Sequence, residues 1–246
     1  MRSTLQNALF AAVVLAAAQC VTRGQGSFQD LDFESAVLVP IPGASYPTVQ
    51  FAAAFPGWTG LVGGEQQTGA LYNNVFGGTS AICIIDNGWP AGIPGMGVGG
   101  VISGNYTAIL QAGLIITVTT NYPANTALSQ TGLVPAAAQS LLFKAYDPNA
   151  SLSPIIPLVV TLGSQRLSYT ALGSGANYTL YGANLPALAG QTAELDFTVE
   201  SGGGVDNSVF LDSIQFSDQA IPEPGVFGLA GLGALLLGWR MLRRRR

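Results

Sequence analysis

The sequence predicts an all-β body, an antiparallel β-sandwich or jelly roll, over residues 27–220. Glycine, serine, threonine, asparagine and alanine are abundant there, and no long amphipathic helical period occurs before the C-terminal tail. Several segments of strand length alternate apolar and polar residues, and turn residues separate them. Many short strands with such breaks favour a sandwich over any α/β fold. At about 194 residues, the body is long enough for one substantial core.

The clearest strand covers residues 192–201. One face carries Ala193, Leu195, Phe197 and Val199, and the other carries Glu194, Asp196, Thr198 and Glu200. Because successive strand residues point to opposite faces, the first face is expected to pack on a core and the second to meet water.

Eight further segments have the same character. In chain order they are residues 31–34, 105–110, 114–121, 140–146, 158–162, 166–172, 177–181 and 207–217. Glycine and proline between Trp89 and Gly100 mark a long loop. Cys83 lies between Ala81-Ile82 and Ile84-Ile85, which indicates a buried thiol in a strand.

The charge of this body excludes several functions. Its basic side chains are Lys144 and Arg166, against twelve carboxylates, so its net charge is about −10. Such a surface repels nucleic acid. The chain contains no histidine, which excludes histidine-based triads and histidine-ligated zinc. No nucleophile elbow, metal cluster, phosphate loop or cofactor fingerprint occurs, so we expect no catalytic activity.

The C-terminal tail combines three features in a fixed order. Pro222-Glu223-Pro224 interrupts regular structure, and an uncharged apolar run follows from Gly225 to Trp239. Extended by Met241 and Leu242, with Arg240 reaching the interface, this run is close to the length of a membrane-spanning helix.

A basic cluster ends the chain and predicts its orientation. Arg240, Arg243, Arg244, Arg245 and Arg246 are expected to stay on the cytoplasmic side of a membrane. The body would then lie outside the cell.

This tail, residues 221–246, resembles the PEP-CTERM sorting signal of exported bacterial proteins. The resemblance implies that a membrane-embedded exosortase recognises Pro222, Glu223 and Pro224, removes the helix and releases the protein to the cell surface or an extracellular polysaccharide matrix. The alternative is an ordinary tail anchor with a proline-containing stem.

The N-terminus is consistent with export. Arg2 precedes an apolar segment from Ala8 to Ala18, which is typical of a secretory signal peptide within residues 1–26. Cleavage after Gly26 is preferred to cleavage after Ala18, because a strand-like segment begins soon after. Only Cys83 would then remain, so no disulfide could form within the chain.

Short phrases of the body resemble galactose-binding-like jelly rolls, which are common among carbohydrate-binding modules. They are residues 32–34, Gly57-Trp58, residues 128–135, residues 140–143 and residues 210–214, in the order in which that family has them. The resemblance implies a jelly-roll fold and, as an alternative function, a module or adhesin that binds an extracellular polysaccharide.

The sequence predicts that the Asp212 carboxylate needs a cation or a hydrogen-bond donor as its partner. In an unbroken last strand, Asp212 would share a face with Phe210 and Ile214, and a buried carboxylate must be paired or neutralised. The family resemblance implies a structural calcium ion held by Glu34 and Asp212. The alternatives are a bulge in the strand, or an Asp212 that accepts hydrogen bonds from loop amides while Glu34 is solvated.

Sugar binding would use exposed aromatic rings together with amide or acidic side chains. The candidates are Trp58, Trp89, Tyr106, Tyr178 and Tyr181. Each of them is also a candidate for the core or for a turn.

Overall fold

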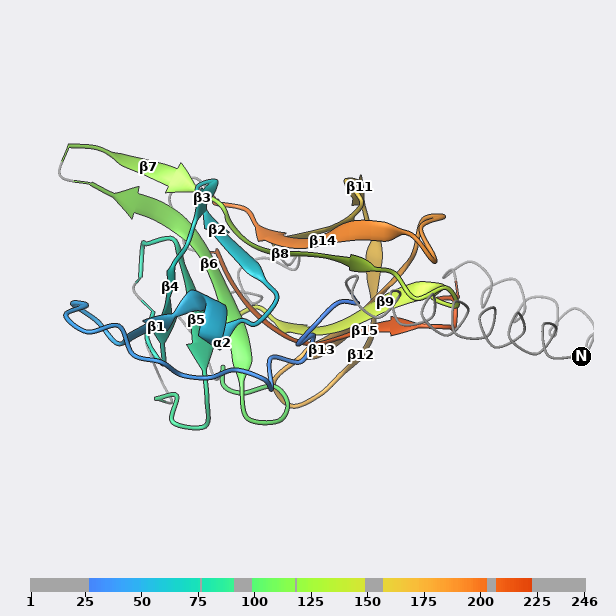
Figure 1. Ribbon diagram of the computed structural model, residues 1–246, viewed down its shortest axis with the longest axis horizontal. Coiled ribbons are helices and arrows are strands. Elements are labelled where there is room, and N and C mark those ends of the chain that lie inside the picture. The colour runs from blue at the N-terminus through green and yellow to red at the C-terminus, as the bar shows by residue number, and fades with distance from the viewer. Residues whose placement is uncertain are drawn as a thin grey trace, which may run out of the picture.

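Two β-sheets pack face to face in the computed structural model, which describes residues 27–75, 77–90, 99–117, 119–148, 157–202 and 207–222. Figure 1 shows the smaller sheet, with β8 and β14, lying over the larger one, with β9 and β15. The protein is therefore a β-sandwich, and the predicted fold class is confirmed. The expected helices at the two ends of the chain lie outside the described residues.

The smaller sheet has the strand order β11-β10-β14-β8-β2-β3. Its strands are β2 (Thr59–Val62), β3 (Glu65–Gln66), β8 (Thr126–Leu133), β10 (Leu158–Leu162), β11 (Gln165–Arg166) and β14 (Thr192–Val199).

The larger sheet has the order β1-β4-β5-β6-β15-β9-β13-β12, and β7 pairs with β6. Its strands are β1 (Thr48–Gln50), β4 (Gly69–Tyr72), β5 (Ala81–Ile85), β6 (Thr107–Ile116), β7 (Asn121–Ala124), β9 (Ser140–Tyr146), β12 (Tyr169–Ser174), β13 (Thr179–Asn184) and β15 (Asn207–Ser217). A short helix, α2 (Phe51–Ala54), follows β1.

From β8 onward the chain alternates between the two sheets. β8, β10–β11 and β14 belong to the smaller sheet, and β9, β12–β13 and β15 belong to the larger one. The pairs along both sheets are antiparallel except for β4 and β5, which run parallel. The expectation of an antiparallel sandwich therefore needs this one correction.

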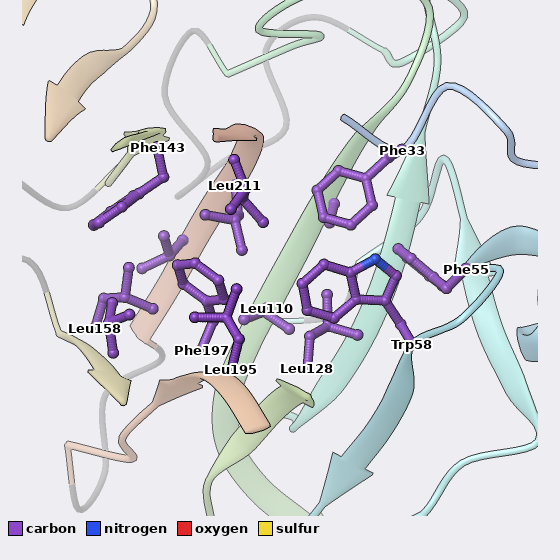
Figure 2. Packing of buried hydrophobic residues seen from close by; sticks show 14 of the residues in the cluster. Phe33, Phe55, Trp58, Leu110, Leu128, Phe143, Leu158, Leu195, Phe197 and Leu211 are labelled. Carbon is purple, nitrogen blue, oxygen red and sulfur yellow. The ribbon is translucent and has the colours of Figure 1, made fainter. Parts of the chain in front are cut away.

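The core fills the space between the sheets. Phe197 of β14 lies 5.5 Å from Phe143 of β9 and 6.4 Å from Trp58, measured between ring centroids. Figure 2 shows Leu110 and Leu128 between the rings of Phe197 and Trp58, with Phe143 on the far side of Phe197. Ala193, Leu195, Phe197 and Val199 are all buried, as their alternation predicted.

A second, smaller cluster covers the opposite face of the larger sheet. Its buried members are Val75, Cys83, Ile85, Trp89, Ile102, Ile109 and Phe210. Cys83 is the buried strand thiol that the sequence predicted, and burial raises the pKa of the thiol to about 12.

Three predicted strands have the observed bounds, namely 140–146, 158–162 and 207–217, and 192–201 ends two residues early. Residues 166–172 are divided between β11 and β12, and the strand predicted at 177–181 covers 179–184. Residues 105–110 and 114–121 were predicted as two strands, but β6 runs through both and turns back into β7.

The strand predicted at residues 31–34 is wrong, because these residues form a turn. Asp30 and Phe33 have positive φ angles, and the Asp30 carboxylate accepts a hydrogen bond from the Ser35 backbone N–H at 2.8 Å. Local bonds of this kind compete with strand formation. The Phe33 side chain packs in the core against Phe55 and Trp58, so the apolar signal reflects one anchor and not an alternating strand.

Candidate functional site

The last strand contains a bulge directly after Asp212, and it decides which way Ile214 points. β15 pairs with β9 through Asp212, and the register shifts before pairing resumes at Gln215. Ser213, within the bulge, has φ +50°. Before the bulge, Val209 and Leu211 face the main core, whereas Ile214 faces it afterwards. The bulge left open by the sequence is present, and Asp212 lies on the opposite face of the sheet from Ile214.

The Asp212 carboxylate is fully buried and hydrogen-bonded. Its Oδ2 accepts hydrogen bonds from the Thr107 hydroxyl at 2.6 Å and from the Ser103 backbone N–H at 3.1 Å, and Oδ1 accepts one from the Ser213 hydroxyl at 3.1 Å. Burial raises the pKa of Asp212 from 3.8 to about 6, although these hydrogen bonds lower it.

Glu34 binds the same turn from the other side. Its Oε1 accepts hydrogen bonds from the backbone N–H groups of Asn105 at 2.7 Å and Tyr106 at 3.0 Å, and Oε2 accepts one from the Asn105 side-chain amide at 2.7 Å. Burial raises the pKa of Glu34, but the three hydrogen bonds outweigh it and hold the pKa below its ordinary value. Glu34 therefore holds Asn105 and Tyr106 in place through hydrogen bonds and is not simply solvated.

The two predicted calcium ligands therefore meet at one turn, residues 103–107. N–H and O–H donors occupy their oxygens, whereas calcium needs six to eight oxygen ligands. Among the described residues, no three acidic, cysteine or histidine side chains come together to hold a metal ion. This donor set favours the alternative in which hydrogen bonds satisfy both carboxylates, and the calcium ion that the family resemblance implies is left to be tested by its effect on Tm.

The candidate aromatic residues fall into two groups. Trp58 and Trp89 are buried in the two apolar clusters, and Tyr106 is half-buried against the main one. Tyr178 and Tyr181, in contrast, line one cavity of about 250 Å³ at an end of β13. Only these two remain candidates for contact with a ligand.

This cavity, which we call the tyrosine cavity, is also lined by Tyr146, Asp147 and Asn177. The Tyr181 ring stacks on Phe143, so mainly its hydroxyl is left for the cavity. Burial, and then the nearby Asp147 charge, raise the pKa of Tyr181. The Lys144 ammonium lies 5.0 Å from the centroid of the Tyr178 ring. The cavity therefore offers hydroxyl, amide and carboxyl groups more than open ring faces.

The chain leaves the sandwich at the opposite end of β13. Ile221 is bound on both sides by Asn184, which donates to its carbonyl at 2.9 Å and accepts from its N–H at 2.7 Å. Pro222 follows and is exposed. Glu223 and Pro224 of the sorting motif, and Arg240 with Arg243–Arg246, lie outside the described residues, among which no helix is long and apolar enough to cross a membrane.

Sequence reasoning missed the partners of these residues. Asn184 is 37 positions from Ile221, and Asn105 is 71 positions from Glu34. No local pattern marks either pair. Asn105 lies beside a glycine in Ser103-Gly104-Asn105, a pattern typical of turns. This pattern indicates a turn whose asparagine amide could donate a hydrogen bond.

No family model matches the chain, and no curated protein does. Three solved structures resemble the fold. The chain is 12% identical to a carbohydrate-binding module of the β-sandwich superfamily described as promiscuous in specificity, with a TM-score of 0.40, and the match covers 80% of this chain and 64% of that one.

The second structure is TmCBM61 in complex with β-1,4-galactotriose, at 12% identity and a TM-score of 0.35, covering 80% of this chain and 100% of that one. The third is the enzymatically active domain of tailspike protein 4 of bacteriophage CBA120, at 15% identity and a TM-score of 0.33, covering 66% and 19%. Likenesses of this size carry no conclusion about a ligand, and the fold rests on the two sheets themselves.

The raised pKa of Asp212 predicts a pH dependence of stability. Between pH 3.8 and about 6, the folded protein binds more protons at Asp212 than the unfolded chain does. The free energy of unfolding therefore falls as pH rises through this window. Asp212→Asn keeps an oxygen for Thr107 and Ser103 but has no charge. Between pH 4 and pH 7, we expect the free energy of unfolding of wild type to fall by roughly 1–3 kcal/mol relative to that of Asp212→Asn.

Urea unfolding in the presence of EDTA measures this shift, with exposed Asp218→Asn as the control. A wild-type-minus-variant difference that does not change with pH would contradict the account. Because hydrogen bonds satisfy both carboxylates, we also expect equal Tm values in millimolar calcium and in EDTA. A calcium-dependent rise in Tm that Asp212→Asn abolishes would instead establish the predicted ion.

Proposed function

We propose that this chain is an exported, non-catalytic protein of the cell surface or extracellular matrix, sorted through its C-terminal tail. Residues 1–26 would direct export, residues 27–220 would form the external body, and residues 221–246 would anchor it in the membrane. An exosortase would then recognise Pro222-Glu223-Pro224 and remove the helix.

The observation that carries this proposal is where the sandwich ends. β15 ends at Ser217, and hydrogen bonds hold the following residues as far as Ile221. The exposed Pro222 comes next, so the described sandwich is complete before the first residue of the motif. A processing enzyme that cuts there would release a complete sandwich without unfolding a strand.

The charge of the body supports an external location and a non-enzymatic role. Its net charge of about −10 favours solubility and discourages contact with nucleic acid and other polyanions. Among the described residues, three acids have raised pKa values, namely Asp30, Asp196 and Asp212. Burial in separate parts of the sandwich is the main cause of each shift. None of them lines the tyrosine cavity.

Intact mass tests the sorting proposal. We expect protein recovered from the envelope or medium of the native host to lack the residues after the Pro-Glu-Pro motif, and the same chain made in a host without an exosortase to retain them. Glu223→Ala should retain the tail in both hosts, with Glu200→Ala as a control. If the protein from the native host retains residues 225–246, the proposal is contradicted and a permanent tail anchor is favoured.

The second candidate is polysaccharide binding through the tyrosine cavity. One observation favours it, since two of the five predicted aromatic residues meet there with Tyr146, Asp147 and Asn177. β13 carries this cavity at Thr179 and the tail contact at Asn184. Five strand steps of about 3.3 Å separate them by roughly 17 Å, so the cavity lies at the end of the sheet away from the tail.

Affinity electrophoresis tests this candidate with the host's exopolysaccharide and with a β-1,4-galactan as probes. We expect Asp147→Asn and Tyr178→Phe each to weaken retention about 5- to 20-fold, because the first removes a charged acceptor and the second removes a hydroxyl from a confined cavity. Tyr122→Ala, on the exposed β6–β7 hairpin, is the control. Unchanged retention in both cavity variants, or no retention of wild type by either probe, would rule out this site.

A further inference from the structure

The segment that precedes the sorting motif is held on the body by side chains. The Gln139 amide donates to the Asp218 carbonyl at 2.6 Å, and the Ser140 hydroxyl donates to the Gln219 carbonyl at 2.6 Å. Asn184 then binds both the N–H and the carbonyl of Ile221. These bonds replace the ladder that a strand would make, so the position of Pro222 is fixed relative to β9 and β13.

The side chain of Ile221 also packs against the larger sheet. Gly182 of β13 leaves room on the face turned away from the core. A Cβ there would lie 2.8 Å from Ile221 Cδ1 and 2.6 Å from Leu172 Cδ1. A side chain at position 182 would therefore have to push aside the terminal methyl groups of Ile221 and Leu172. The missing side chain allows the tail to lie close to the sheet.

A second cavity, of about 420 Å³, opens where this segment ends. We call it the tail pocket. Its lining includes Ile221, Pro222, Asn184, Gly182, Ser168 and Arg166. Pro222, the last described residue, forms part of the wall, so the described chain ends at this pocket.

The charges complement each other at this pocket. Arg166 is one of two basic side chains in residues 27–220, and the other, Lys144, lies over Tyr178 near the far end of β13. Among the described residues, the exposed Arg166 has no carboxylate partner. The residue that follows Pro222 is Glu223, the acid of the motif.

We propose that the tail pocket is the docking site of Glu223 and Pro224, with the Glu223 carboxylate paired with the Arg166 guanidinium. The folded body then covers the motif, and the motif must leave the pocket before a protease can bind it in an extended form. The docking rests on the geometry of the body, and its effect on processing rests on the proposed sorting function.

Carboxyl-carbon NMR titration of the full chain in detergent micelles tests the docking. The chain has five glutamates, and Glu223→Gln assigns the signal of Glu223 by its loss. We expect the acid dissociation constant of Glu223 to be about two- to five-fold larger in wild type than in Arg166→Gln, as for a modest ion pair. Lys144→Gln, which removes the other basic side chain, should leave it at the wild-type value.

Equal dissociation constants in wild type and Arg166→Gln would overturn the docking, whether or not the tail is cut. A difference that disappears on dilution would also overturn it, because a second copy would then fill the pocket. A saturable shift of the Arg166 side-chain signals by the host exopolysaccharide, with Glu223 unaffected by Arg166→Gln, would assign the pocket to a saccharide instead.

Processing in the native host is followed separately. We expect Arg166→Gln and Asn184→Ala to lose the tail about two- to five-fold faster than wild type, and Lys144→Gln at the wild-type rate. Equal rates would overturn the covering role. If the titration difference is present and wild type is never cut, the docking stands and the sorting function fails.

Discussion

The bulge at Asp212–Ser213 is the constraint on which the rest of the structure depends. β15 is the central strand of the larger sheet, since it pairs with β6 on one side and with β9 on the other. In a regular strand, a residue that faces the core is followed two positions later by another. The bulge adds one residue, so that Leu211 and Ile214 both face the core. Asp212 faces away from this core by ordinary alternation from Phe210, and its side chain meets the polar turn at residues 103–107.

The same bulge sets the path of the chain after the strand. Gln215, Phe216 and Ser217 pair with β9 in the shifted register, and this pairing brings Gln219 beside Ser140 and Ile221 beside Asn184. The tail thus leaves at a defined point, beside Arg166 and far from the tyrosine cavity. The proposed sorting at one end of the larger sheet and the proposed ligand binding at the other are compatible in one molecule, because the two cavities share no residue.

The sequence predicted the sandwich and several strand bounds because alternation is a local signal, and residues 140–146 and 207–217 carry it fully. It failed at residues 31–34, where Phe33 is a single anchor in a turn, and it divided β6, because Gly113 reads as a break but lies within the strand. It located Asp212 as a residue that needs a partner. The partners themselves, Thr107 and Ser103, are more than 100 positions away and follow from the sheet pairing, which no local pattern contains.

Substitution of Ser213 measures the role of the bulge most directly, with Ser213→Gly and Ser213→Val as the matched pair, because both remove the hydroxyl. Glycine tolerates the positive φ of this position, so we expect Ser213→Gly to stay within about 1 kcal/mol of wild type in urea unfolding. A β-branched side chain does not tolerate it, so we expect Ser213→Val to cost about 1–3 kcal/mol. A Ser213→Val variant as stable as Ser213→Gly would contradict the account.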